Sequence, residues 1–478
     1  MFISLLVTRN IVTLEPNITV RNIFGKSIQL PILLAVLQAN ADEFQALATS
    51  FSLTKTLAGV HHATNNNPDG SAINFWNSGF EGQPAVSASL SNPHAAGADA
   101  YGNIFIADKS SHAILRISAD GLIHTFAGTH VAGFNGDGPA QATSLQISSP
   151  NGLHVLPNGV VYLLDPGNHR IRRVNPDGQM TTVIQDTDPN WAPSGRALWV
   201  SPDEQVIYYT HEYPPVPPST RANGAVLKKW TPAGGIQTVC SRTVGLVNPA
   251  NIDVNPADGK LYLTDRAEED STKMAQGLFR IDGIDQRTRI TGNASQPNAA
   301  AGHLAINSFI EEPRGIAFRP DGAYFICGHK DGSIWFVDTT GILHQYLNGS
   351  GKKDAYAFPD NQHPPLVDKN YFSQPRSVGL APNGNLLMVS NDSGFLFQVQ
   401  NDFLAQATNL NLRLVAAGAQ LEWLGAAGRG YRIERATNLQ TSAWNPVNAV
   451  RGVVGTTTFF EPSFTSNGNR FYRVLPAR

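Results

Sequence analysis

A four-part pattern at residues 149–184 most constrains what this chain can fold into. Three short apolar runs and a weaker fourth, at residues 152–156, 160–164, 170–174 and 180–184, are separated by Pro-Asn-Gly, Asp-Pro-Gly-Asn and Asn-Pro-Asp-Gly. Short runs rich in Val, Ile, Leu and Tyr between turn residues predict a four-stranded antiparallel meander. A single meander of this size cannot bury both faces, so it needs neighbours from elsewhere in the chain.

The same pattern recurs along the chain. Residues 92–128 match the first copy in register, and weaker copies cover residues 193–239, 249–290, 313–347 and 375–399. Six copies, about 40 to 65 residues apart, have the spacing of propeller blades with variable loops. We therefore expect an all-β chain with a six-bladed β-propeller over residues 54–400.

The two ends of the repeat region predict how the ring closes. The last copy has three strands and no fourth, whereas residues 54–58 stand alone before the first copy and are similar to the outer strand at residues 125–128. We expect this N-terminal strand to complete the sixth blade. Such a closure removes the open edge of an incomplete sheet.

These repeats resemble NHL repeats. The resemblance is closest at Asn158-Gly159-Val160-Val161-Tyr162-Leu163-Leu164-Asp165, at Gly167-Asn168-His169-Arg170-Ile171-Arg172, and in the connector at residues 132–140. It covers about residues 54–400 and implies a six-bladed β-propeller. The third and fourth copies lack the Asn-His-Arg segment, so their loops are expected to differ.

The pattern changes after Asp402. Strand-like segments at residues 410–424, 429–434, 452–460 and 470–475 predict a small β-sandwich over residues 409–478. Its expected core aromatics are Trp423, Tyr431, Trp444 and Tyr472. The segment is similar to fibronectin type III-like modules at the C-terminus of exported bacterial proteins. Such a module could also only space or anchor the propeller.

The N-terminus indicates export. An apolar run at residues 28–37 follows Arg21 and Lys26 and precedes an Ala-x-Ala site that ends at Ala41. This order predicts that residues 1–41 are a secretory signal, with the true start downstream of Met1. A helical or disordered N-terminal segment is the alternative. The signal places the protein in the periplasm, on the cell surface or outside the cell.

Composition narrows the classes of partner. The chain has 35 basic and 37 acidic residues, a formal net charge of -2, so a nucleic acid is not an expected partner. No apolar run reaches the roughly 18 residues of a membrane span.

The two cysteines, Cys240 and Cys327, fall in different repeats, and we expect two separate buried thiols. The protein is expected to be a monomer.

The mouth of the propeller channel is the expected ligand site. Residues just after each blade-opening proline should gather there: His94, Asn151, Ser194, Ala250 with Asn251, Arg314 and Arg376. A polar ring with two arginines suits an anionic or polyhydroxyl ligand. The alternative is that these side chains only hydrogen-bond neighbouring innermost strands.

A second set of residues belongs to the repeat itself. Asp108 with His112, and Asp165 with His169 and Arg170, stand where the second strand of a copy ends. An Asp in this place can accept backbone N–H groups and hold the following arginine, so we interpret the set as a structural signature.

The sequence contains no motif that demands catalysis. Nucleophile-elbow, zinc-protease, Cys-x-x-Cys and phosphate-loop motifs are all missing. Six-bladed propellers of the gluconolactonase-like group hold a divalent metal in the channel, and Asn151 and Asn251 are weak candidates for such ligands. No glutamate partner is evident, so no cofactor is identified and a divalent metal stays an option.

The favoured function is therefore a non-catalytic binding protein. The propeller mouth would bind a carbohydrate, a peptide or a surface protein. The alternative is a metal-dependent hydrolase, lactonase or lyase with its site in the channel.

Overall fold

Two compact units make up the part of the chain that the computed structural model describes. One unit lies within Leu47–Phe403 and the other within Leu404–Arg478. The described residues are 52–60, 62, 66–69, 71–189, 191, 195–214, 224–267, 272–349, 374–391, 394–401, 408–415, 418–424, 430–436, 445–451, 456–461 and 471–476. The expected signal at residues 1–41 lies outside them.

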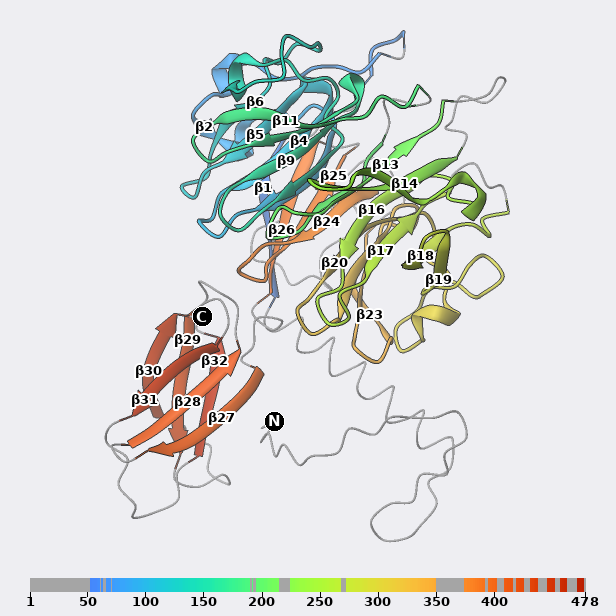
Figure 1. Cartoon of the computed structure of the whole chain (residues 1–478). Coiled ribbons are helices and arrows are strands. Elements are labelled where there is room, and N and C mark those ends of the chain that lie inside the picture. Colours follow the sequence, from blue (N-terminus) through green and yellow to red (C-terminus); the bar gives the residue numbers. More distant parts are fainter. Residues whose placement is uncertain are drawn as a thin grey trace. The chain divides into compact units, whose positions relative to one another are not determined.

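The described part of the first unit is built from six antiparallel sheets and short 3-10 turns, without an α-helix (Figure 1). The first sheet has the order β2 (Gln83–Pro84), β6 (Leu122–Ala127), β5 (Ala113–Ile117), β4 (Ile104–Asp108) and β3 (Pro93–Ala98). The second has the order β7 (Ala140–Gln141), β11 (Gln179–Gln185), β10 (Arg170–Val174), β9 (Val161–Asp165) and β8 (Gly152–Val155).

Four further sheets follow in chain order. The third contains β12 (Leu198–Val200), β13 (Ile207–Glu212), β14 (Ala225–Thr231) and β15 (Gly235–Cys240). The fourth contains β16 (Pro249–Val254), β17 (Leu261–Asp265), β18 (Gly277–Gly283) and β19 (Gln286–Arg289). The fifth contains β20 (Pro313–Phe318), β21 (Tyr324–Gly328), β22 (Ile334–Val337) and β23 (Leu343–Leu347). The sixth contains β24 (Pro375–Leu380), β25 (Leu386–Ser390), β26 (Phe395–Asn401) and β1 (Ser52–Ala58).

Short 3-10 turns connect several of these strands. They are η1 (Ser78–Phe80), η2 (Ala85–Ser87), η3 (Lys109–Ser111), η4 (Ala142–Ser144), η5 (Pro166–Asn168), η6 (Arg242–Val244) and η7 (Ala305–Asn307). The tight turn before the second strand of a sheet needs a left-handed backbone, and glycine supplies it: φ is 91° at Gly102 and 85° at Gly159. The sequence pattern thus recurs because each sheet needs the same turn.

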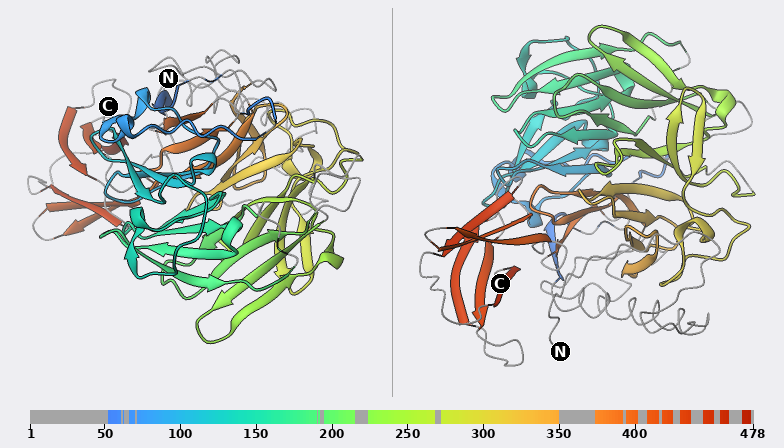
Figure 2. Two further views of the ribbon diagram at one scale, coloured as in Figure 1. Left: turned by 90° about the horizontal axis from the view of Figure 1, so that it is seen from above. Right: turned by 60° about the horizontal axis from the view of Figure 1, so that its bottom comes forward.

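The first strand of each sheet lies next to the first strand of the following sheet. β3 contacts β8, β8 contacts β12, β12 contacts β16, β16 contacts β20, β20 contacts β24, and β24 contacts β3. In the left view of Figure 2 the sheets follow one another in sequence order, from blue through green and yellow to orange. This arrangement brings the starts of these innermost strands together.

The strand from the N-terminal side completes the last sheet. β1 pairs antiparallel with β26, and Thr54 lies opposite Val399 and Thr56 opposite Phe397. The pairing joins segments about 340 residues apart, and β26 is the partner that the sequence pattern predicts for residues 54–58.

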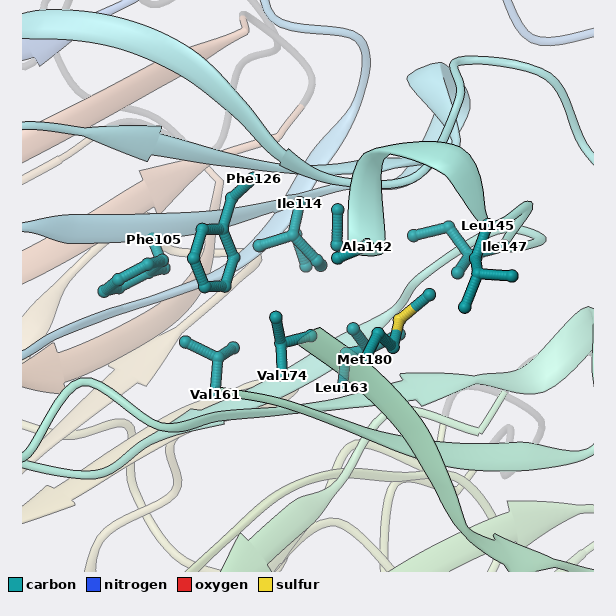
Figure 3. Packing of buried hydrophobic residues seen from close by; sticks show 12 residues of the cluster. Phe105, Ile114, Phe126, Ala142, Leu145, Ile147, Val161, Leu163, Val174 and Met180 are labelled. Carbon is teal, nitrogen blue, oxygen red and sulfur yellow. The ribbon is translucent and has the colours of Figure 1, made fainter. Parts of the chain in front are cut away.

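Apolar side chains between adjacent sheets form the core. Between the first two sheets, Phe105, Ile114 and Phe126 face Val161 and Leu163, as Figure 3 shows. The rings of Phe105 and Phe126 meet edge to face with centroids 4.8 Å apart. Burial of such side chains contributes about 1.5–3 kcal/mol each and holds neighbouring sheets together.

The second unit contains two three-stranded sheets. One has the order β27 (Thr408–Val415), β28 (Gly418–Leu424) and β31 (Thr456–Glu461), and the other has the order β30 (Asn445–Arg451), β29 (Gly430–Ala436) and β32 (Phe471–Pro476). Trp423 and Tyr431 are buried in its core and Tyr472 packs against it. Trp444 lies outside the described residues.

Some details differ from the sequence predictions. β2 and β7 lie in segments that the sequence presents as connectors, and β30 is a strand that the pattern does not mark. Two-residue edge strands are too short to show an alternating pattern. Cys240 and Cys327 are free buried thiols, as expected. No helix among the described residues is long and apolar enough to cross a membrane.

Candidate functional site

A small pocket, with a volume of about 10 Å³, lies where the innermost strands begin. It is lined by nine residues: His94, Ala95, Asn151, Arg196, Ala250, Asn251, Arg314, Arg376 and Ser377. All five candidates for ligand binding, His94, Asn151, Asn251, Arg314 and Arg376, are among them. They converge because each follows the proline that starts an innermost strand. Ser194 lies outside the described residues.

Glycines let the innermost strands approach closely at this end. A Cβ on Gly152 would lie 2.2 Å from the Arg196 carbonyl oxygen, which is closer than any side chain allows. The contact places Arg196 beside Asn151, and both line the pocket.

Arg376, Asn391 and His94 form a connected polar row. An NH2 group of Arg376 donates to Asn391 Oδ1 at 2.7 Å, and Asn391 Nδ2 lies 3.2 Å from His94 Nδ1. Burial, followed by the charge of Arg376, holds the pKa of His94 well below its usual value. The ring is therefore neutral at pH 7, and its proton is on Nδ1, because Nδ1 donates to the Asn92 carbonyl oxygen at 2.9 Å.

Two carboxylates hold the remaining arginines at the mouth. Buried Glu212 lies 3.9 Å from Arg196 Nε and 3.9 Å from an Arg266 nitrogen. Glu312 lies 3.3 Å from Arg314. Glu212 thus serves two arginines from different sheets.

Lys109 adds a further cation. Burial, followed by the charges of Arg196 and Arg376, lowers the pKa of Lys109 to about 8. The protonated form of a lysine is disfavoured where several cations share a site that is shielded from water, and its pKa falls. Burial is the main cause of the lowered pKa, and the two arginine charges add to it.

Sequence reasoning missed a second ring of residues. Lys109, Arg266, His329 and Asn391 each follow the last residue of the second strand in their sheet. This position directly follows the repeat position of Asp108 and Asp165. Aligning the six copies at this position could therefore have found these residues from the sequence. His329 lies near the arginines of the pocket, because the charges of Arg314 and Arg376 both help to lower its pKa.

The pocket does not suit a divalent metal. Asn151 and Asn251 both line it, but no carboxylate does, whereas three arginines do. Calcium and magnesium prefer several oxygen ligands with carboxylates among them, and adjacent guanidinium groups repel a dication. Among the described residues, no group of three or more His, Cys, Asp or Glu side chains could hold a metal ion.

The repeat-signature carboxylates tie strand ends to the mouth loops. Asp108 Oδ1 accepts the backbone N–H of Ser91 at 2.7 Å, and Asp165 Oδ1 accepts that of Ser148 at 2.7 Å. Both donors stand two residues before the proline that opens the innermost strand. Each Asp therefore fixes the loop that leads into its own innermost strand.

The expected pairing of Asp165 with Arg170 is wrong. Arg170 Nε donates instead to Asp137 at 2.8 Å, and its guanidinium lies 3.9 Å from the Phe134 ring centroid. The arginine nearest Asp165 is Arg172, at 3.8 Å. Arg170 and Arg172 lie on the same face of β10, because alternate residues of a strand share a face, and of the two it is Arg172 that pairs with Asp165.

The two histidines of the signature reach the following connector. His112 Nδ1 accepts the backbone N–H of Ser149 at 3.1 Å, and the His169 ring stacks 5.5 Å from that of Trp191. Both residues have left-handed backbones, with φ of 51° and 54°. They link one sheet to the loop before the next.

Comparisons with known proteins identify the class of fold. Neither a protein-family model nor a curated protein matches the chain. A structural genomics protein of unknown function from Bacteroides thetaiotaomicron matches with a TM-score of 0.50 and 13% identity, over 73% of this chain and 76% of that one. An auxiliary nutrient binding protein from Bacteroides ovatus matches with a TM-score of 0.50 and 12% identity, over 73% and 76% of the two chains. A streptogramin B lyase has a TM-score of 0.43 and 14% identity, over 74% and 99%.

These likenesses concern the fold alone. The first unit has a β-propeller fold, as its antiparallel sheets and the two matches at a TM-score of 0.50 support.

Proposed function

We propose that the first unit is a six-bladed propeller of the NHL type, closed by β1, that acts as a non-catalytic binding module. The six sheets, the circle of contacts among β3, β8, β12, β16, β20 and β24, and the pairing of β1 with β26 support this architecture. The ligand is a carbohydrate, a peptide or a surface protein that enters the mouth.

The pocket at the mouth carries the proposal. Its lining combines three arginines, two asparagines and a histidine on strand ends that the sheets hold rigidly. Such groups bind polar ligands through charge-assisted and neutral hydrogen bonds. A metal-dependent hydrolase or lactonase would need carboxylates in the lining, and Asn151 and Asn251 alone do not supply them.

The other parts of the chain are assigned by the same proposal. Residues 1–41 direct export to the periplasm, the cell surface or the medium and are then removed, and the protein acts as a monomer. The second unit, residues 409–478, is a fibronectin type III-like module that spaces or anchors the propeller. A nutrient-binding protein among the structural neighbours is compatible with an exported binder.

Binding and catalysis can be separated with the purified full chain. We expect the protein to bind members of a glycan array, to release them chemically unchanged, and to contain no stoichiometric divalent metal by elemental analysis. The variant Asn151→Ala should lose that binding, and Asn158→Ala, in a turn outside the pocket, should keep it. Cleavage of a bound ligand, or one equivalent of metal that Asn151→Ala releases, would overturn the proposal.

A further inference from the structure

A wide groove lies at the end of the first unit opposite the mouth. Its volume is about 850 Å³, within the roughly 300–1,000 Å³ of small-ligand sites, whereas the pocket at the mouth has only about 10 Å³. Its lining includes Gly102 and Asn383, which lie in the turns that follow the innermost strands β3 and β24. The groove therefore lies between the first and the sixth sheets, at the far end of their innermost strands.

The two walls of this groove differ in chemistry. The sixth sheet supplies most of the polar side chains: Lys55, Thr56, Asn383, Asn385, Gln398 and Gln400. The first sheet and its connectors supply mainly aliphatic side chains and glycines: Val86, Gly102, Ile104, Ile117, Ala119 and Gly121. No described residue of the lining is aromatic or acidic. The groove thus has an amide-rich wall and an aliphatic wall.

Asn385 indicates that the amide-rich wall is suited to a ligand. The residue is 3% exposed, and its Oδ1 has no hydrogen-bond partner among the described residues. Asn103 follows the turn glycine of the first sheet in the same way, and its side chain donates to Asp99 at 2.7 Å. The turn itself therefore does not require an unsatisfied amide. A donor group of a ligand in the groove would satisfy the Asn385 oxygen.

Gln398 and Gln400 give the amide-rich wall a repeat. They alternate with the buried Val399 on β26, so their Cα atoms are about 6.8 Å apart. An extended peptide presents every second side chain on one face with the same spacing. Between the two walls, one face of such a peptide meets amide groups while the other meets Ile104 and Ile117.

The walls also favour a peptide over a sugar. Val86 lines the groove and is 51% exposed, so apolar surface is available for a ligand to cover. A sugar carries hydroxyl groups on all sides, and those against the aliphatic wall would lose their hydrogen bonds to water. Lys55 is an exposed cation in a lining without a described carboxylate, which favours an acidic group on the ligand.

We propose that this groove is a second binding site, which takes an extended peptide with alternating polar and aliphatic side chains. The polar side chains face Gln398 and Asn385, and the aliphatic ones face Ile104 and Ile117. One polar position is acidic and lies at Lys55, which is opposite Gln398 in the pairing of β1 with β26. The site is separate from the mouth and does not depend on the function proposed for it.

Calorimetry on the full chain with two capped hexapeptides tests the pattern. The probe is Glu-Val-Thr-Val-Thr-Val, and the control is Glu-Thr-Thr-Val-Val-Val, which has the same composition without the alternation. We expect a dissociation constant of about 100 µM or lower for the probe and binding at least about tenfold weaker for the control. Gln in place of Glu in the probe should weaken binding about threefold, because one exposed ion pair is lost. High salt should remove this difference.

Matched variants locate the site. Asn385→Leu should weaken binding of the probe at least about tenfold and keep or raise the thermal midpoint, because it removes an unsatisfied buried oxygen. A residue with only a structural role would lower the midpoint instead. Gln398→Leu should weaken binding in the same way. Gln237→Leu is its control, because Gln237 is exposed on β15 of the third sheet, and it should bind the probe as the wild type does. Asn151→Ala at the mouth should also bind the probe normally.

Several outcomes would overturn the inference. Equal binding of the two hexapeptides would exclude the alternating pattern, and binding of maltotriose but of neither peptide would assign the groove to a sugar. Unchanged binding by folded Asn385→Leu and Gln398→Leu variants would place the peptide elsewhere, and a loss in Asn151→Ala alone would place it at the mouth. No binding of the probe at about 1 mM would remove the second site. The function proposed for the mouth would still stand, because the glycan array tests it separately.

Discussion

Asp108 and Asp165 occupy the same repeat position but have different charged neighbours. Asp165 lies 3.8 Å from Arg172, and both side chains are fully buried. In the first sheet Leu115 stands in the register position that corresponds to Arg172. Burial raises the pKa of Asp108 to about 7 and that of Asp165 to about 6. Each of the two carboxylates therefore accepts a hydrogen bond from its own mouth loop, but only Asp165 also pairs with a buried arginine.

Replacing each carboxylate by an amide should separate these roles. Asp165→Asn leaves the buried guanidinium of Arg172 without a counter-charge, and we expect the free energy of unfolding to fall by about 3 kcal/mol at pH 8. Asp108→Asn keeps an acceptor for Ser91, so it should lower the free energy of unfolding by less than about 1 kcal/mol. Denaturant unfolding of both variants measures the difference. Equal losses would mean that the pair with Arg172 is unimportant.

The pH dependence of Asp108 has a defined sign. Its pKa is about 7 in the folded protein against 3.8 ordinarily, so the folded state binds the proton more tightly than the unfolded state. The stability that this provides is fully present at acidic pH and is lost as the pH rises through about 7. The stability of Asp108→Asn relative to the wild type should therefore increase between pH 5 and pH 8. A constant difference over this range would contradict the raised pKa.

The innermost strands depend on close contact between backbones. Gly315, in β20, faces β24, and a Cβ at this position would lie 2.4 Å from the Val378 backbone nitrogen. At this point β20 and β24 can therefore approach each other only because β20 lacks a side chain there. This proximity also sets the width of the mouth, because Arg314 and Arg376 precede the contact in the two strands.

Gly315→Ala should consequently be costly. The methyl group cannot move away from a backbone atom, so β20 and β24 must separate, and we expect a loss of about 3 kcal/mol in unfolding free energy. Gly283→Ala is the matched control, because its Cβ would meet first the flexible Gln286 side chain at 3.5 Å. It should alter stability by less than about 1 kcal/mol. Thermal and denaturant unfolding provide the comparison, and a stable Gly315→Ala variant would contradict the close packing.

At the scale of the whole first unit, β1 joins the two ends of the sheet series. Without it, β26 would present an unpaired edge of backbone N–H and C=O groups, which promotes association of chains. Buried Ala58 also packs in the core cluster that contains Leu90 and Leu396. β1 thus contributes both hydrogen bonds and apolar contacts.

Two truncations test this closure. Deletion of residues 1–59 should lower the thermal midpoint by more than about 5 °C and yield oligomers in light scattering, since the edge is exposed. Deletion of residues 1–41 retains β1 and should leave the midpoint and the monomeric state unchanged. If both truncated proteins behave alike, β1 does not close the unit.

Much of the fold could be predicted from local patterns. A strand is short, and its turns are set by neighbouring residues, so the pattern at residues 149–184 predicts β8 to β11 within one or two residues. The edge strands β2 and β7 could not be found, because two residues carry no period. Arg170 was assigned the wrong carboxylate, because its partner Asp137 lies 33 residues away in a connector.

Some residues at the mouth of the channel could likewise be predicted from the repeat pattern, and others could not. The sequence by itself determined which residues reach it, since a proline at the start of each innermost strand sets the position of His94, Asn151, Asn251, Arg314 and Arg376. Only the tertiary structure decided that Arg196 joins them and that Lys109 and Arg266 add their charges. The reason is physical: position within a repeat is a local property, whereas the field in a pocket is a sum over charges from strands far apart in the chain.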